Sequence, residues 1–205
     1  MKYMYRVLLP LLVFVTLLSC KNDAKESTGD TSGETTQVVS EKPVVKERKI
    51  PTEAEKKQAK SVLSKLMVTP ELKAFTSFLV SAQLTDLMMK DEGPYTVLAP
   101  TNEAFDNLEE ELRNGLFRRE NKDQLSAILK NHIVSGSLDS ATLFQNSKSG
   151  NYTLTNLNGE TLTVTKEGND IVISSASGVQ AKIGKSDIHG SNGVVHVVDA
   201  VFVAN

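Results

Sequence analysis

The chain has 205 residues, with 23 Lys and Arg against 25 Asp and Glu, which gives a formal net charge of -2. It is 40% hydrophobic but only 5% aromatic, and it contains one Cys and no Trp. The apolar content suffices for a folded core, and the length fits one domain with flanking segments, since domains average about 150 residues. Near-neutral charge and few aromatic side chains argue against a nucleic-acid partner. A single Cys excludes a disulfide framework and a Cys-based zinc site.

Residues 1–19 are expected to be a signal peptide. Lys2 and Arg6 form a short basic start, and an apolar run follows over residues 7–18. This run is shorter than the ~20 residues that a membrane-spanning helix needs, and Pro10 interrupts it. A basic start before a short apolar run is typical of a leader that is removed after export.

Cys20 directly follows the apolar run and the small residue Ser19. Residues 17–20, LLSC, resemble the lipobox cleaved by bacterial lipoprotein signal peptidase, which implies that Cys20 is the lipidated N-terminus of the mature chain. The alternative is an ordinary secretory leader with an incidental Cys. Several acyl chains, at about 0.8 kcal/mol per buried methylene, hold a protein on a membrane without a spanning helix.

The resemblance to lipoproteins also implies a location. We expect a lipid-anchored protein of the bacterial cell envelope, attached to the membrane through its N-terminal lipid only. Lys21, rather than Asp, follows Cys20. In many Gram-negative bacteria this favours the outer membrane, where the domain faces either the periplasm or the cell surface.

Residues 20–56 are expected to comprise the lipidated Cys and a disordered tether. The segment is rich in Lys, Glu, Ser and Thr, contains no aromatic residue, and its few Val and Ile residues show no sustained period. A flexible chain of about 36 residues has a root-mean-square span of ~30–36 Å. Such a tether lifts a domain clear of the lipid headgroups.

Residues 57–205 are expected to fold. Helical spacing over residues 57–67 and 70–89 predicts two helices, and a buried strand is predicted over 95–99. Thr101 or Asn102 is expected to cap a helix that carries Phe105, Leu108 and Leu112. A further helix is expected from Asn121, with Gln124 completing a capping box and Gly136 ending it.

The apolar period changes to two beyond Gly150, which indicates strands. Hairpin turns are expected at residues 158–159 and 168–169, because both pairs combine Asn with Gly. The predicted strands are 152–154, 161–165, 171–174, 179–183, 194–198 and 200–203. Helices followed by strands predict an α+β fold.

Three segments resemble signature segments of the fasciclin-domain family. Residues 93–105, GPYTVLAPTNEAF, resemble the first, and residues 192–201, NGVVHVVDAV, resemble the second. Between them, residues 129–136, LKNHIVSG, resemble the family's central Tyr-His segment. The three occur in the family's order within one domain, residues 57–205. The resemblance implies N-terminal helices packed around a β-sheet wedge, a non-catalytic module without a cofactor, and a role in cell adhesion or matrix association.

The resemblance also supplies candidate partner-binding residues. In adhesive family members a Tyr-His pair has been linked to receptor binding, and Asn131 and His132 occupy those positions here. Asp187 and Ile188 match an Asp-Ile pair in an integrin-recognition segment of animal members. From the residues themselves, a His on an apolar face is more often a satisfied core residue, and the same interpretation is favoured for His196 in its apolar strand.

Three functions remain open at this point. The favoured one is a membrane-tethered, non-catalytic module that binds an envelope or extracellular protein or glycan. The second is a carrier of a small ligand, which needs an enclosed apolar pocket with a few polar groups. The third is a hydrolase, which needs titratable residues with shifted pKa values that meet in a cleft. No metal site is expected, since His132, His189 and His196 lie on separate elements.

Overall fold

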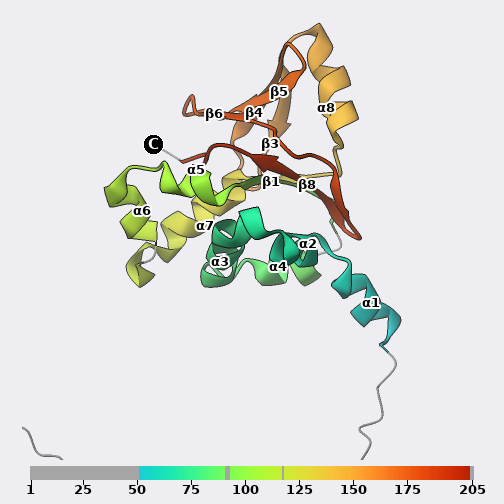
Figure 1. Ribbon diagram of the computed structural model, residues 1–205, viewed down its shortest axis with the longest axis vertical. Helices are drawn as coiled ribbons and strands as arrows, with labels where there is room; N and C mark the ends of the chain where they lie inside the picture. Colours follow the sequence, from blue (N-terminus) through green and yellow to red (C-terminus); the bar gives the residue numbers. More distant parts are fainter. Residues whose placement is uncertain (1–50, 91–92, 117, 204–205) are drawn as a thin grey trace, which may run out of the picture. The chain divides into compact units, whose positions relative to one another are not determined.

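Two four-stranded sheets organise the fold (Figure 1). The computed structural model describes residues 51–90, 93–116 and 118–203. In the first sheet the strand order is β2-β1-β8-β7, and in the second it is β3-β4-β5-β6. The first sheet comprises β1 (Tyr95–Pro100), β2 (Ile133–Ser135), β7 (Ile188–Gly190) and β8 (Gly193–Val198). The second comprises β3 (Tyr152–Thr155), β4 (Thr161–Glu167), β5 (Asp170–Ser174) and β6 (Gln180–Lys182).

The two family-like terminal segments lie side by side in the first sheet. β1 and β8 pair in parallel, from Tyr95 opposite Gly193 to Pro100 opposite Val198. Every residue of both strands is buried, as the apolar run around His196 predicted for a central strand. The backbone of Gly193, which has a φ of 151°, lies close to that of Tyr95. A Cβ atom there would collide with the Tyr95 backbone, so glycine is required.

The helices divide between the two sheets. α2 (Val62–Val68), α3 (Lys73–Ser81) and α4 (Thr85–Lys90) gather on one side of the first sheet (Figure 1). α5 (Asn102–Asp106), α6 (Glu110–Leu116) and α7 (Lys122–Asn131) follow β1 along the chain. α8 (Ser140–Asn146) packs beside β4 and β5 of the second sheet. Short 3₁₀ turns lie at Pro70–Leu72, Arg119–Asn121 and Ser147–Ser149.

Two apolar cores share the central strands. One forms between the helices and the first sheet, and it includes Val97 and Val195. The other forms between the two sheets, and it includes Leu98, Val198 and Phe202. Because successive side chains of a strand point to opposite faces, β1 and β8 contribute to both cores. The α+β fold with helices packed around a sheet is therefore confirmed.

Several predicted boundaries were wrong. The predicted helix over residues 70–89 is broken at Gln83, whose φ is 60°, and α4 starts anew at Thr85. The predicted capping box at Asn121 does not form, because the Asn121 side chain donates instead to the Gly115 carbonyl oxygen, 3.0 Å away. Its helix ends at Asn131 rather than near Gly136. Residues 201–203 are buried or half-buried but form no strand.

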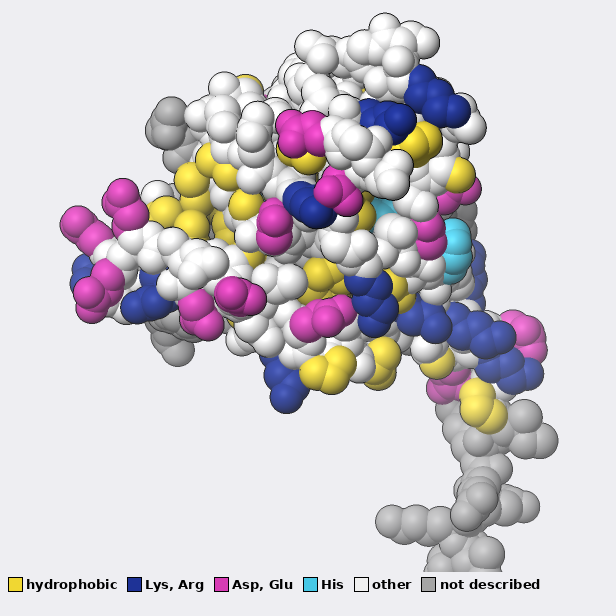
Figure 2. Space-filling view, turned by 45° about the horizontal axis from the view of Figure 1, so that its top comes forward, with side chains coloured by type: hydrophobic (Ala, Val, Ile, Leu, Met, Phe, Trp, Pro, Cys, Tyr) yellow, Lys and Arg dark blue, Asp and Glu magenta, His cyan; other side chains and the backbone are white. Residues whose placement is uncertain are grey.

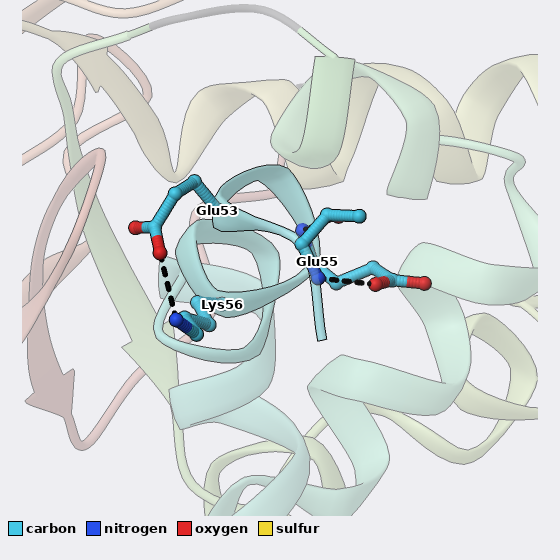
Figure 3. Close-up of polar contacts among 4 residues, drawn as sticks. Glu53, Glu55 and Lys56 are labelled. Carbon is cyan, nitrogen blue, oxygen red and sulfur yellow. Dashed lines mark hydrogen bonds and ion pairs between the residues drawn. The ribbon is translucent and has the colours of Figure 1, made fainter. Parts of the chain in front are cut away.

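The first described helix, α1 (Glu53–Ala59), begins before residue 57, inside the segment expected to be the tether. Thr52 caps it, and the Thr52 and Glu55 side chains bond reciprocally to each other's backbone amides in a capping box. Figure 3 shows Glu53 beside Lys56, joined by a 2.7 Å ion pair. α1 buries no residue, so its local capping, rather than packing of its side chains, accounts for its helical form. The signal peptide, Cys20 and most of the predicted tether lie outside the described residues.

Candidate ligand-binding groove and the buried histidines

His132 lies at the end of α7, where it is fully buried in the core. Its Nδ1 donates to the Leu98 carbonyl oxygen at 2.9 Å, and its Nε2 accepts from the Phe202 backbone amide at 2.9 Å. This pattern requires the neutral tautomer that carries the proton on Nδ1. The ring stacks on Phe202 with 4.6 Å between the centroids. Burial lowers the pKa of His132 from 6.5 to about 3, although the bond to Leu98 acts in the opposite direction.

Asn131 is buried beside it, with 1% of its surface exposed. Its amide nitrogen donates to the Phe202 carbonyl oxygen at 3.4 Å, and its side-chain oxygen accepts from the Asn156 amide at 3.3 Å. Asn131 and His132 therefore join three distant segments of the chain inside the fold. In this arrangement neither side chain lies where a partner would touch it, and a binding role for the pair stays a prediction.

Asp187 is also held by the scaffold. Its φ is 59°, and its carboxylate accepts from the Ser140 backbone amide at 2.8 Å, from the Ser140 hydroxyl and from the Ser186 hydroxyl at 3.1 Å. Burial acts to raise the pKa of Asp187, but the hydrogen bonds from Ser140 and Ser186 outweigh it and the pKa is lowered. Ile188 is half-buried on β7, opposite Val195, and packs against the helix-side core.

His196 completes this network from the middle of β8. Its Nε2 donates to the Leu138 carbonyl oxygen at 2.7 Å, and its Nδ1 accepts from the Asp187 backbone amide at 3.3 Å. Burial lowers the pKa of His196, so the ring is neutral near pH 7. The interpretation of His196 as a buried, hydrogen-bonded residue agrees with this geometry.

The two serines that bond to Asp187 line an open groove of about 380 Å³. One wall is α8, which contributes Ser140, Phe144 and Gln145. The other is the β4–β5 turn and β5, with Asn169 and Asp170, and Ser186 lies on the segment after β6. The Asp187 network therefore contributes two serines, Ser140 and Ser186, to the lining of the groove.

Two lysines that do not themselves line the groove lie over the ring of Phe144, which does. The Lys166 ammonium lies 4.7 Å and the Lys148 ammonium 5.5 Å from the centroid of the ring. Asp170 is engaged by Lys182, whose ammonium lies 2.6 Å from the carboxylate. The arrangement offers an aromatic wall, amide side chains and cations to a polar ligand.

Sequence reasoning did not identify this groove. α8 is only seven residues long and was not predicted, although Asp139 supplies the expected signal: its side chain caps the helix by accepting from the Thr142 amide at 2.7 Å. Asn169 was assigned only a turn role. Nothing in the sequence indicates that α8 and the β4–β5 turn face each other, because that proximity arises from tertiary packing.

Acidic and basic side chains are interspersed over the face of the molecule that Figure 2 shows. Over residues 51–90, 93–116 and 118–203, no three His, Cys, Asp or Glu side chains are grouped so as to hold a metal ion. Within the same residues, no helix has the length and apolar character needed to cross a bilayer.

Comparison with known proteins shows which family this domain resembles in sequence. Residues 70–204 match the model of the fasciclin domain. Protein sll1483 of Synechocystis sp. is 34% identical over 131 residues, which cover 63% of this chain and 67% of that protein. Immunogenic protein MPB70 of Mycobacterium bovis is 29% identical over 137 residues, 65% of this chain and 64% of that one. Human periostin is 28% identical over 135 residues, which span 65% of this chain but only 14% of periostin.

A solved structure supports the same assignment of fold. A fasciclin domain pair from the insect cell adhesion molecule Fasciclin I superimposes with a TM-score of 0.54 at 24% identity. The match covers 64% of this chain and 45% of the pair. The family-like segments that form β1 and β8 both lie within the matched residues 70–204. The chain belongs to the fasciclin-domain family.

Proposed function

We propose that this protein is a lipid-anchored, non-catalytic module of the bacterial cell envelope that mediates adhesion or envelope association by binding a protein or glycan. The observation that carries the proposal is the fasciclin domain itself. The family occurs in adhesion and extracellular-matrix proteins, and its members are secreted or surface-associated. Membrane attachment is supported by residues 1–19, which resemble a leader, and by the lipobox-like segment that ends at Cys20.

The state of the titratable residues supports binding over catalysis. A hydrolase needs groups with shifted pKa values that face a substrate in a cleft. Here His132 is enclosed in the core, and both ring nitrogens of His132 and of His196 are bonded to the backbone. Asp187 accepts from two serines and the α8 backbone. His132, Asp187 and His196, three of the groups whose pKa values are shifted, therefore have structural partners.

The groove beside α8 bears on the carrier alternative. A carrier of an apolar ligand needs an enclosed, mainly apolar pocket. The groove instead opens to solvent, and its lining mixes Ser, Gln, Asn and Asp side chains with apolar ones, Phe144 among them. Its chemistry supports recognition of a polar partner at the surface.

An attachment assay tests the proposal. Cells that lack the gene are compared with cells that express the wild type or Cys20→Ser, using attachment to one another and to a matrix-coated surface. We expect the deletion to reduce attachment several-fold, the wild type to restore it, and the released Cys20→Ser protein to fail. Attachment that is unchanged by the deletion would contradict the adhesion role, and full restoration by Cys20→Ser would contradict the need for a tether.

A further inference from the structure

The α8 groove contains two amide side chains that the fold leaves unused. Gln145 on α8 and Asn169 in the β4–β5 turn both line the groove, both are exposed, and neither side chain forms a hydrogen bond within the described residues. Each amide presents donors and an acceptor together. A sugar hydroxyl is likewise both donor and acceptor, so two free amides in one groove complement the hydroxyls of a sugar.

Phe144 supplies the apolar wall that a sugar needs. Its ring is half-buried, with its inner part packed against the core between the sheets. Sugars carry C–H groups on the faces of the ring, and these pack against aromatic side chains, while their hydroxyls point outward to polar groups. An aromatic wall flanked by amides matches that division, and the Ser140 and Ser186 oxygens, whose protons go to Asp187, can still accept.

The charges at Phe144 add selectivity for an acidic ligand. Lys148 and Lys166 are both exposed, and within the described residues neither forms an ion pair with a carboxylate. An exposed cation–π contact is weak, so either ammonium can turn toward an incoming carboxylate. Two nearby carboxylates already have partners: Asp170 pairs with Lys182, and Asp187 accepts from the Ser140 and Ser186 hydroxyls. Glu167, opposite Asp170 across the hairpin, is exposed.

The geometry points to this groove as the binding site for an acidic polysaccharide whose sugars carry uronic-acid carboxylates. Lys148 and Lys166 pair with the carboxylate, Gln145 and Asn169 bond to hydroxyls, and Phe144 packs on the sugar ring. An acidic peptide is the less favoured occupant, because β5 is paired on both sides, with β4 and β6, and offers no strand edge for β-augmentation. The inference deepens the proposed function by naming its partner class, and rests on it.

Binding of the full-length chain to fluorescent alginate oligosaccharides, measured by anisotropy at about 0.15 M salt, tests the inference. Dextran serves as the neutral probe and a poly-glutamate peptide as the acidic peptide probe. The test variant is Lys148→Gln/Lys166→Gln. The matched control, Lys60→Gln/Lys73→Gln, removes two exposed lysines from other elements and has the same net charge. Gln145→Ala and Phe144→Leu probe the amide and the ring, with the melting temperature checked for each.

We expect the wild type to bind alginate. Its affinity should fall at least ~5-fold in the test variant and in Gln145→Ala, and less than ~2-fold in the matched control. Phe144→Leu keeps the apolar packing and is expected to lose a similar factor. The inference is overturned by no binding to alginate at about 1 mM uronate, by equal binding to dextran, by tighter binding to poly-glutamate, or by equal losses in test and control variants. If alginate binding fails while attachment of cells still requires the gene, the groove assignment falls and the proposed function stands.

Discussion

At the scale of single residues, the family-like histidines act as internal connectors. His132 links β1, through Leu98, to the C-terminal segment, through Phe202, by two hydrogen bonds and a stacked ring. His196 links β8 to Leu138 and to the residue that holds the start of α8. Both connections require neutral rings, because each ring accepts a bond from a backbone amide.

This requirement predicts a pH dependence. The folded-state pKa of His132, about 3, lies below its ordinary value of 6.5. Between these values the unfolded chain binds a proton that the folded chain excludes. The contribution of neutral His132 to the free energy of unfolding is therefore complete above pH 6.5 and declines as the pH falls toward 3. We expect urea denaturation to show a loss of up to about 1.4 kcal/mol per pH unit from this site. His132→Gln should reduce that slope, and His196, whose pKa is lowered too, should supply part of what remains. Equal slopes for wild type and His132→Gln would contradict the assignment.

Asp187 permits a second test at this scale. Asn tolerates a φ of 59°, so Asp187→Asn keeps the backbone, but it removes the charge and replaces one of the two oxygens that accept from Ser140 and Ser186 with an NH2 donor. We expect a loss of about 1–3 kcal/mol in the free energy of unfolding at pH 7, since charged acceptors strengthen hydrogen bonds. Asp170→Asn, which breaks a half-exposed ion pair, should cost less than about 1 kcal/mol. Equal costs would show that the Asp187 network has no special stabilising role.

At the scale of elements, the parallel pairing of β1 with β8 closes the fold. Gly193 starts β8 at the point where a Cβ atom would meet the Tyr95 backbone. Gly193→Ala is therefore expected to lower the free energy of unfolding by about 3 kcal/mol or more, because both the contact and the φ of 151° oppose a side chain. In Gly184→Ala the nearest atom to the added Cβ lies 4.0 Å away, so thermal melting should change little. Similar melting temperatures for the two variants would contradict the predicted close approach.

The elements also show what the sequence could predict. The strands with hairpin turns were predicted because a period of two and Asn–Gly pairs are local signals, and the turn glycines Gly159 and Gly168 have positive φ values. β2, β7 and α8 were missed because three to seven residues are too short to establish a period. Gln83 broke a helix without any Gly or Pro to mark the break. The groove residues Phe144 and Asn169 meet only through tertiary packing, which no local pattern encodes.

At the scale of the whole molecule, segments far apart in the sequence pair and hydrogen-bond within one folded domain. Asn192 bonds to the Val62 amide and the Met88 carbonyl oxygen, and β8 lies between β1 and β7. We expect deletion of residues 192–205 to abolish cooperative unfolding, because it removes a strand that is buried on both faces. Deletion of residues 21–50 should leave the melting temperature nearly unchanged. Cooperative melting of the C-terminal deletion near the full-length temperature would contradict the interpretation as one folding unit.

The proposed function requires that lipid on Cys20 hold the fasciclin domain at the membrane. The most direct measurement is metabolic labelling of the full-length protein with an alkyne fatty acid, followed by flotation of membranes and thermal melting. We expect the wild type to be labelled and to float with the membranes, and Cys20→Ser to be unlabelled and soluble but to melt at the same temperature. Labelling or flotation of Cys20→Ser at the wild-type level would contradict lipidation at Cys20.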